Sequence, residues 1–266
     1  MMNGVLFIAL LVVWQEKTDG GDPTVLPQAS AAHSTQPIAV DTLDLAPSVS
    51  PTTLGTKQRL NYDQWVTLLG QEMSTMAAKN PDHLTILLGD SLSLWFPTEL
   101  LPGQRVWMNQ GISGEKTHTL RARLDLLNVA DVDTIFLMIG INDLIWGQSD
   151  QQLIANYRDI MDYLATQHPK TQIVVQSILP HGAESSTWES RSLLLELPNE
   201  RIRSMNQSLE KIAKDYDAHY LELYPIFSTG EGTLRPDLTT DGLHLNREGY
   251  LVWRAAIALY SQLELP

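Results

Sequence analysis

Hydrophobic positions follow two alternating patterns from about residue 60 to the end of the chain. Short runs of consecutive apolar residues are typical of strands buried on both faces, and longer stretches with an apolar residue every three or four positions are typical of amphipathic helices. The strand-like runs are residues 84–89, 105–109, 133–140, 171–179 and 218–224. The helix-like stretches are residues 61–80, 115–127, 149–168, 198–217 and 246–263. Because strand and helix alternate throughout, the sequence predicts an α/β fold, a three-layer α/β/α sandwich built on a five-stranded parallel sheet.

The first part of the chain has neither pattern. Residues 4–14 are apolar, but they are too few to cross a membrane, which takes about 20 residues. Their length suits the core of a signal peptide, although the first basic residue, Lys17, follows them instead of preceding them. A buried helix is the alternative, but the next stretch offers nothing to pack against it. The sequence therefore favours a segment for export or membrane anchoring over residues 1–14; without that role the protein would be cytoplasmic.

Residues 15–56 are rich in Pro, Thr, Ser, Ala and Asp and show no apolar periodicity. This composition is typical of a flexible linker. Residues 57–266 then form the single folded domain that we expect.

The composition excludes several classes of protein. The chain of 266 residues has 18 Lys and Arg against 31 Asp and Glu, a net charge of −13, which argues against binding to nucleic acid or to an anionic membrane surface. It has no cysteine, so disulfides, thiolate catalysis and cysteine-based zinc sites are excluded. No HExxH motif, His-rich stretch or Asp cluster points to a metal, and we expect no cofactor.

Residues that can act together in one reaction follow four of the five predicted strands. Ser91 follows the first strand, Gly114 lies in "GISGE" after the second, Asn142 lies in "GIND" after the third, and Asp241 and His244 lie in "DGLH" after the fifth. Because the carboxyl ends of parallel strands meet at one edge of the sheet, we expect these residues to lie close together. A serine, a histidine with a nearby carboxylate and two further hydrogen-bond donors are what acyl transfer requires.

Each residue type has a defined use in that chemistry. The Ser91 hydroxyl becomes nucleophilic when His244 accepts its proton, and Asp241 can hold the other nitrogen of the imidazole. The backbone N–H groups of Ser91 and Gly114 and the side-chain amide of Asn142 can stabilise the negative oxygen of the tetrahedral intermediate.

These four blocks resemble those of the SGNH, or GDSL-type, family of serine esterases and lipases. The resemblance extends over residues 84–250, with all four blocks in order. It implies a flavodoxin-like fold, with Ser91 as the nucleophile and Asp241 and His244 as the acid and base. It also implies that Gly114 and Asn142 complete the oxyanion hole.

Other interpretations compete with these roles. Ser91 can be a helix N-cap that happens to follow a strand. Trp95 and Trp146 fall beside the site, where they can pack in the core or bind a substrate. Residues 183–197 form a connection longer than needed, which is either a lid over the site or an ordinary helical turn packed on the core.

The sequence thus predicts a serine ester hydrolase acting on a small-molecule, lipid or glycan ester. A glycan O-acetylesterase is one alternative, and a catalytically inactive lipid- or sugar-binding module on the same fold is another. The acyl length of the substrate and the oligomeric state stay open.

Overall fold

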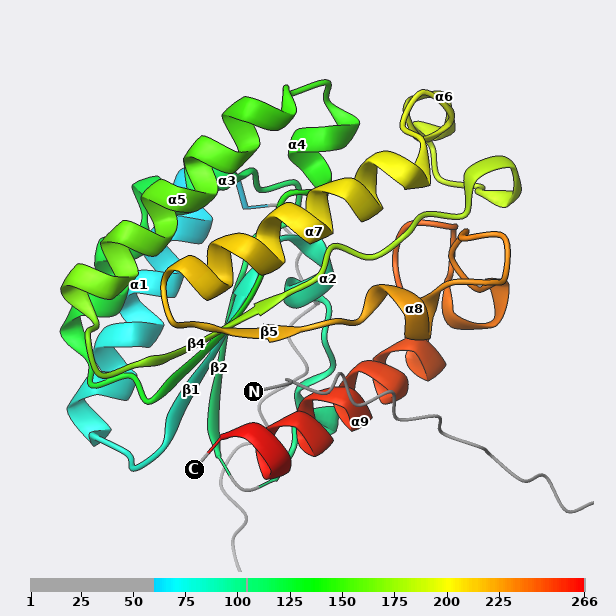
Figure 1. Ribbon diagram of the computed structural model, residues 1–266. Coiled ribbons are helices and arrows are strands. Elements are labelled where there is room, and N and C mark those ends of the chain that lie inside the picture. Colours follow the sequence, from blue (N-terminus) through cyan, green and yellow to red (C-terminus); the bar gives the residue numbers. More distant parts are fainter. Residues whose placement is uncertain (1–59, 104, 266) are drawn as a thin grey trace, which may run out of the picture. The chain divides into compact units, whose positions relative to one another are not determined.

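The computed structural model describes residues 60–103 and 105–265, and within them five parallel strands form one sheet (Figure 1). The strands are β1 (Leu84–Gly89), β2 (Val106–Gly111), β3 (Thr134–Met138), β4 (Gln172–Gln176) and β5 (His219–Leu221). Their order across the sheet is β2-β1-β3-β4-β5, and every pair is parallel. This is the strand order of flavodoxin-like folds, in which ligands bind beyond the carboxyl ends of the strands where the order reverses, between β1 and β3.

Helices cover both faces of the sheet (Figure 1). One face packs against α1 (Tyr62–Lys79), α3 (Thr117–Ala122), α5 (Asp150–Gln167) and α7 (Asn199–Asp215). The other face packs mainly against α9 (Arg247–Glu264), with α2 (Ser91–Leu94) and α8 (Tyr224–Phe227) beside it. The remaining short helices are α4 (Ile141–Ile145) and α6 (Arg191–Leu195).

The strands are apolar on both faces because both faces are covered. Ile86 and Leu88 of β1 pack on the α1 side, whereas Leu87 between them packs on the α9 side. Side chains of a strand point alternately to its two faces, so a continuous apolar run is what a sheet buried on both sides requires. The three-layer α/β/α prediction is confirmed.

Local boundaries differ from the sequence prediction in two informative ways. The helix expected over residues 115–127 is α-helical only from Thr117 to Ala122 and continues as a 3₁₀ helix from Leu124 to Val129. Arg123 interrupts it with backbone angles φ −114° and ψ 8°, and its side chain is buried. In addition, β1 and β3 are followed almost at once by the short helices α2 and α4, which the sequence patterns did not predict.

The predicted export or anchor segment at residues 1–14 and the predicted linker at residues 15–56 lie outside the described residues. Within the residues that the structure describes, no helix is both long enough and apolar enough to span a membrane.

Candidate active site

Ser91 lies at the sharp corner where β1 ends and α2 begins. It is the first residue of α2 and is 6% exposed. The N-cap is Asp90, whose Oδ1 accepts a hydrogen bond of 3.0 Å from the backbone N–H of Leu92. The interpretation of Ser91 as an N-cap is therefore wrong, and its hydroxyl is not needed to cap the first turn of α2.

Close backbone packing supports this corner. A Cβ atom on Gly111, at the end of β2, would lie 2.4 Å from the backbone nitrogen of Leu94 and 2.9 Å from the carbonyl oxygen of Asp90. Only glycine allows α2 to approach β2 so closely. The Tyr250 hydroxyl of α9 holds the helix from another direction by donating to the carbonyl oxygen of Leu92 at 3.0 Å.

Gly114 and Asn142 come from the loops after the two strands that flank β1. Gly114 is exposed and has a φ of +76°, a conformation that favours glycine, and a Cβ atom there would meet no protein atom within 4 Å. The backbone angle, and not a lack of space around Cβ, is therefore what favours glycine at this position. Asn142 lies in α4, is 8% exposed, and donates from Nδ2 to the carbonyl oxygen of Glu115 at 3.0 Å. This hydrogen bond links the two loops.

The described residues leave several N–H donors free near this corner. No hydrogen bond within them uses the backbone N–H of Ser91 or of Gly114. The Asn142 amide has two N–H bonds, of which the contact with Glu115 uses one. Free N–H groups of this kind are able to bind a negatively charged oxygen.

Asp241 and His244 form a hydrogen-bonded pair in the loop before α9. Nδ1 of His244 lies 2.8 Å from Oδ2 of Asp241, and Oδ1 of Asp241 accepts the backbone N–H of His244 at 2.8 Å and of Leu243 at 2.9 Å. Partial burial acts to raise the pKa of Asp241, but these hydrogen bonds outweigh it and hold the pKa below its ordinary value. Asp241 is thus ionised at neutral pH and fixes the orientation of the imidazole.

Trp95 connects this pair to the serine corner. Its ring lies against the His244 ring, with centroids 4.3 Å apart, and its backbone N–H donates to the carbonyl oxygen of Ser91 at 3.0 Å. His244 therefore lies against the residue that ends α2, although no hydrogen bond joins the Ser91 hydroxyl to the imidazole within the described residues. Nδ1 is occupied by Asp241, which leaves Nε2 as the nitrogen available to a proton donor.

Trp146 lies just beyond α4, four residues after Asn142. Trp146 is 56% exposed, and Nζ of Lys116 lies 5.9 Å from the centroid of its ring. Trp95 is 48% exposed. Both tryptophans therefore present large apolar area to solvent beside the candidate residues, which excludes core packing as their main role.

Acidic side chains are buried beneath the corner. Burial raises the pKa of Asp90 to about 7, and the nearby carboxylates of Glu115 and Asp143 add to the shift. Oδ2 of Asp90 has no hydrogen-bond partner within the described residues. Asp143 accepts from both the backbone N–H and the hydroxyl of Thr117, the latter at 2.6 Å.

The segment 183–197 packs against both the core and the loop that carries Asp241. Leu194 and Leu197 are buried in the core on the α7 side. The carbonyl oxygen of Asp241 accepts from the backbone N–H of Thr187 and of Trp188, at 2.8 and 3.0 Å. These contacts fit a turn packed on the core and supporting Asp241, and they do not suggest a lid.

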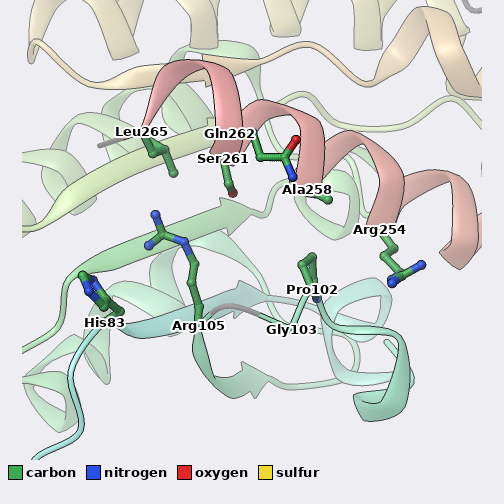
Figure 2. A pocket seen from close by; sticks show the side chains of 9 residues that line it. All are labelled: His83, Pro102, Gly103, Arg105, Arg254, Ala258, Ser261, Gln262 and Leu265. Atoms are coloured by element: carbon green, nitrogen blue, oxygen red, sulfur yellow. The ribbon is translucent and has the colours of Figure 1, made fainter.

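A cavity of about 650 Å³ lies at the opposite end of the sheet (Figure 2). Its lining includes His83 and Arg105, which precede β1 and β2 at their amino ends. The Arg105 guanidinium points into the cavity and is already paired with Asp133 at 2.8 Å. None of the candidate catalytic residues lines this cavity, so it is not part of the candidate active site.

Residues 60–103 and 105–265 contain no group of three or more His, Asp or Glu side chains that could hold a metal ion.

The sequence patterns missed the ion pair between Glu115 and Arg123, which lies directly behind the site. A signal was present, because Arg123 occupies the same helical stripe as Leu120 and Leu127. A charged residue on an apolar stripe requires a buried partner.

An α/β sandwich with a serine at the first strand–helix corner and an Asp–His pair beside it is typical of a class of ester hydrolases. The sequence matches the GDSL-like Lipase/Acylhydrolase family over residues 87–252. The chain therefore belongs to this family, and it is a carboxylic ester hydrolase.

Individual relatives are distant. Platelet-activating factor acetylhydrolase IB subunit alpha1 of Bos taurus is 24% identical over 210 residues, covering 75% of this chain and 84% of that protein. A structure described provisionally as a platelet activating factor from Streptococcus pneumonia has a TM-score of 0.63 at 26% identity, covering 74% of this chain and 95% of the other. The acetyl xylan esterase AlAXEase has a TM-score of 0.53 at 20% identity, covering 68% and 99%, and shows the likeness of fold alone.

Proposed function

We propose that this protein hydrolyses esters by a Ser91–His244–Asp241 triad with an oxyanion hole formed by Ser91, Gly114 and Asn142. The observation that carries the proposal is the 2.8 Å hydrogen bond between Asp241 and His244, held beside the Ser91 corner by the Trp95 ring. Membership of an acylhydrolase family and the order of the four sequence blocks support it.

The steps follow from these groups. The Ser91 hydroxyl attacks the ester carbonyl carbon while its proton moves to Nε2 of His244, and the resulting imidazolium is stabilised by the Asp241 carboxylate. The tetrahedral intermediate then expels the alcohol, which takes the proton from His244, and leaves an acyl group on Ser91. A water molecule repeats the sequence and releases the carboxylic acid. In free hydrolases the hydrogen bond between nucleophile and base is often long and tightens when substrate binds.

The negative oxygen of each tetrahedral intermediate needs donors that are already in place. The unused N–H groups of Ser91 and Gly114 and the second N–H of Asn142 meet this need. Such donors contribute most where the charge is shielded from water, and both Ser91 and Asn142 are buried.

A short acyl group, above all acetyl, is the substrate feature we favour. Two of the three relatives named above, the platelet-activating factor acetylhydrolase subunit and the acetyl xylan esterase, carry an acetyl ester in their names, and this supports the proposal. The exposed faces of Trp95 and Trp146 suit the alcohol part of the ester, either a sugar ring or an apolar group. A profile of hydrolysis against acyl length, from p-nitrophenyl acetate to octanoate, tests this, and a preference for octanoate would contradict it.

The sequence also supports an export or anchoring role for residues 1–14, as their length and apolar composition suggest. This proposal is independent of the chemistry at Ser91.

The triad is tested with Ser91→Ala and His244→Ala, assayed on p-nitrophenyl acetate and with a fluorophosphonate that labels active serines. Each variant should lose nearly all activity while keeping the thermal midpoint, and the double variant should be little worse than either, because the residues act as a unit. Ser93→Ala is the matched control, because its hydroxyl is buried on the same helix without a hydrogen-bond partner among the described residues. Wild-type kcat in Ser91→Ala would show the mechanism to be wrong, and absence of both hydrolysis and labelling in the wild type would favour a binding module.

A further inference from the structure

A buried ion pair lies directly behind the candidate oxyanion hole. Nε and Nη2 of Arg123 contact the two carboxylate oxygens of Glu115 at 2.7 and 2.5 Å, and the two side chains are 3% and 0% exposed. Nη2 also donates to the carbonyl oxygen of Gln110 at 2.7 Å, and Tyr62 donates to Glu115 at 3.2 Å. Every other ion pair in the described residues has at least one partner exposed by about a quarter or more.

Stability alone gives little reason for this pair. Removing two charges from water costs several kcal/mol each, and replacing a buried pair by uncharged side chains of similar size is often neutral or stabilising. A two-pronged contact between a guanidinium and a carboxylate does, however, fix geometry in a way that apolar packing does not.

The pair fixes the loop that carries two of the proposed donors. Glu115 follows Gly114 directly, so anchoring its side chain to Arg123 restrains the Gly114 N–H. The carbonyl oxygen of Glu115 accepts a hydrogen bond from Nδ2 of Asn142 at 3.0 Å, and this fixes the rotation of the amide group about the Cβ–Cγ bond. Asp143, next to Asn142, binds the Thr117 N–H and hydroxyl and closes the link between the two loops.

We propose that the Glu115–Arg123 ion pair is a positioning device that aims the N–H of Gly114 and the amide of Asn142 at one point above Ser91. The inference rests on the proposed oxyanion hole and names the residues that hold it in shape. Neither Glu115 nor Arg123 touches the substrate. Their effect should appear in kcat, because the donors they aim act on charge that develops only in the transition state.

The test is the double variant Glu115→Gln/Arg123→Met. It leaves no buried charge unpaired, it nearly keeps the volume of both side chains, and the carbonyl oxygen of the introduced glutamine can still accept from the Tyr62 hydroxyl. We expect a thermal midpoint close to that of the wild type, a kcat on p-nitrophenyl acetate lower by about 10–100-fold, and a KM changed by less than about threefold, since misplacement of a donor by about 1 Å has effects of this size. A folded double variant with wild-type kcat would overturn the proposal.

Arg123→Lys decides the matter if the double variant does not fold. Lysine keeps the charge but cannot make the two-pronged contact, so kcat should fall by about tenfold with KM retained. A folded Arg123→Lys variant with unchanged kcat would overturn the proposal. Arg121→Met is the control two residues away, and it should leave kcat unchanged because Arg121 pairs with Asp159 at the surface.

A cycle with Asn142→Ala separates the two proposals. If the pair acts through Asn142, the double variant should lower kcat much less in the Asn142→Ala background than in the wild type. If Asn142→Ala alone retains wild-type kcat, the proposed oxyanion hole has failed. If Asn142→Ala lowers kcat and the pair variants do not, only the positioning role has failed.

Discussion

Replacing Asn142 by alanine removes two hydrogen bonds of different kinds, and their sizes can be separated. The proposed bond to the oxyanion exists only in the transition state. Loss of one such donor costs about 3–4 kcal/mol, or about 10²–10³-fold in kcat, with little change in KM. The bond of 3.0 Å to the carbonyl oxygen of Glu115 exists in the free protein, so its loss affects folding.

The effect on stability should be small by comparison. An unmade bond at a buried carbonyl costs about 1–3 kcal/mol, and alanine returns a few tenths of a kcal/mol through its better helix propensity. For a domain of this size the thermal midpoint should then fall by about 2–10 °C. Unfolding cannot imitate the loss of activity, because a hundredfold loss by that route requires about 99% of the protein to be unfolded at the assay temperature.

The assay measures kcat, KM and the thermal midpoint of Asn142→Ala and Asn142→Asp on p-nitrophenyl acetate. The aspartate keeps the size of the side chain but turns a donor into an acceptor that faces both the Glu115 carbonyl and the oxyanion. It should therefore be at least as harmful to kcat as the alanine. A large fall in midpoint with kcat preserved per folded molecule would refute the reasoning and leave Asn142 as a structural residue of the α4 loop.

Three further predictions concern other parts of the molecule. Asp90→Asn should raise the thermal midpoint above that of the wild type by a margin that grows between about pH 4 and about pH 7 and is constant above. Burial raises the Asp90 pKa to about 7, so the native wild type loses stability as the pH rises through this range, whereas the Asn variant has no carboxyl group to ionise. A margin that does not depend on pH in melting curves would contradict this. Trp95→Ala should lower kcat by about 2–10-fold, since it removes the ring that holds His244, whereas Trp146→Ala should change only KM; equal effects on kcat would contradict the distinction. A chain beginning at Thr56 should fold and hydrolyse water-soluble esters at the full-length rate, while the full-length protein should partition with membranes or be found processed outside the cytoplasm; recovery of intact full-length protein from the cytoplasm would exclude export and anchoring.

The sequence predicted the sheet well because its strands are buried on both faces. A run such as residues 84–89 has no polar position at its centre and therefore no competing interpretation. Strand ends were less certain: β5 has only three residues, and of the residues expected to continue it, Glu222 and Leu223 lead into α8, which begins at Tyr224. Helices of four or five residues such as α2 and α4 contain too few positions to show a period, so no pattern could predict them.

The candidate site divides in the same way. Motif spacing predicted which residues lie at the carboxyl edge of the sheet, because topology alone carries them there. It could not predict the Trp95–His244 contact, which depends on how the loop before α9 folds over α2. Nor could it predict that α3 ends at Arg123, although the apolar stripe indicated that this side chain is buried. Both depend on tertiary packing between segments far apart in the chain.

The segment 183–197 leaves and rejoins the domain at one point. Asn199 binds both the backbone N–H and the carbonyl oxygen of His181, at 3.0 and 2.9 Å, and Nε2 of His181 lies 2.6 Å from the carbonyl oxygen of Leu197, so two side chains join the two ends of the segment. An excursion closed in this way can change length and sequence at little cost to the sheet, since closing a longer loop adds only about 0.6 kcal/mol for each doubling of its length. Its hydrogen bonds to the carbonyl oxygen of Asp241 and the burial of Leu194 and Leu197 in the core set the limit on that freedom. In this protein, evolution or laboratory recombination could therefore exchange the segment as a unit, provided that the new segment still fills the core and supports the acid of the proposed triad.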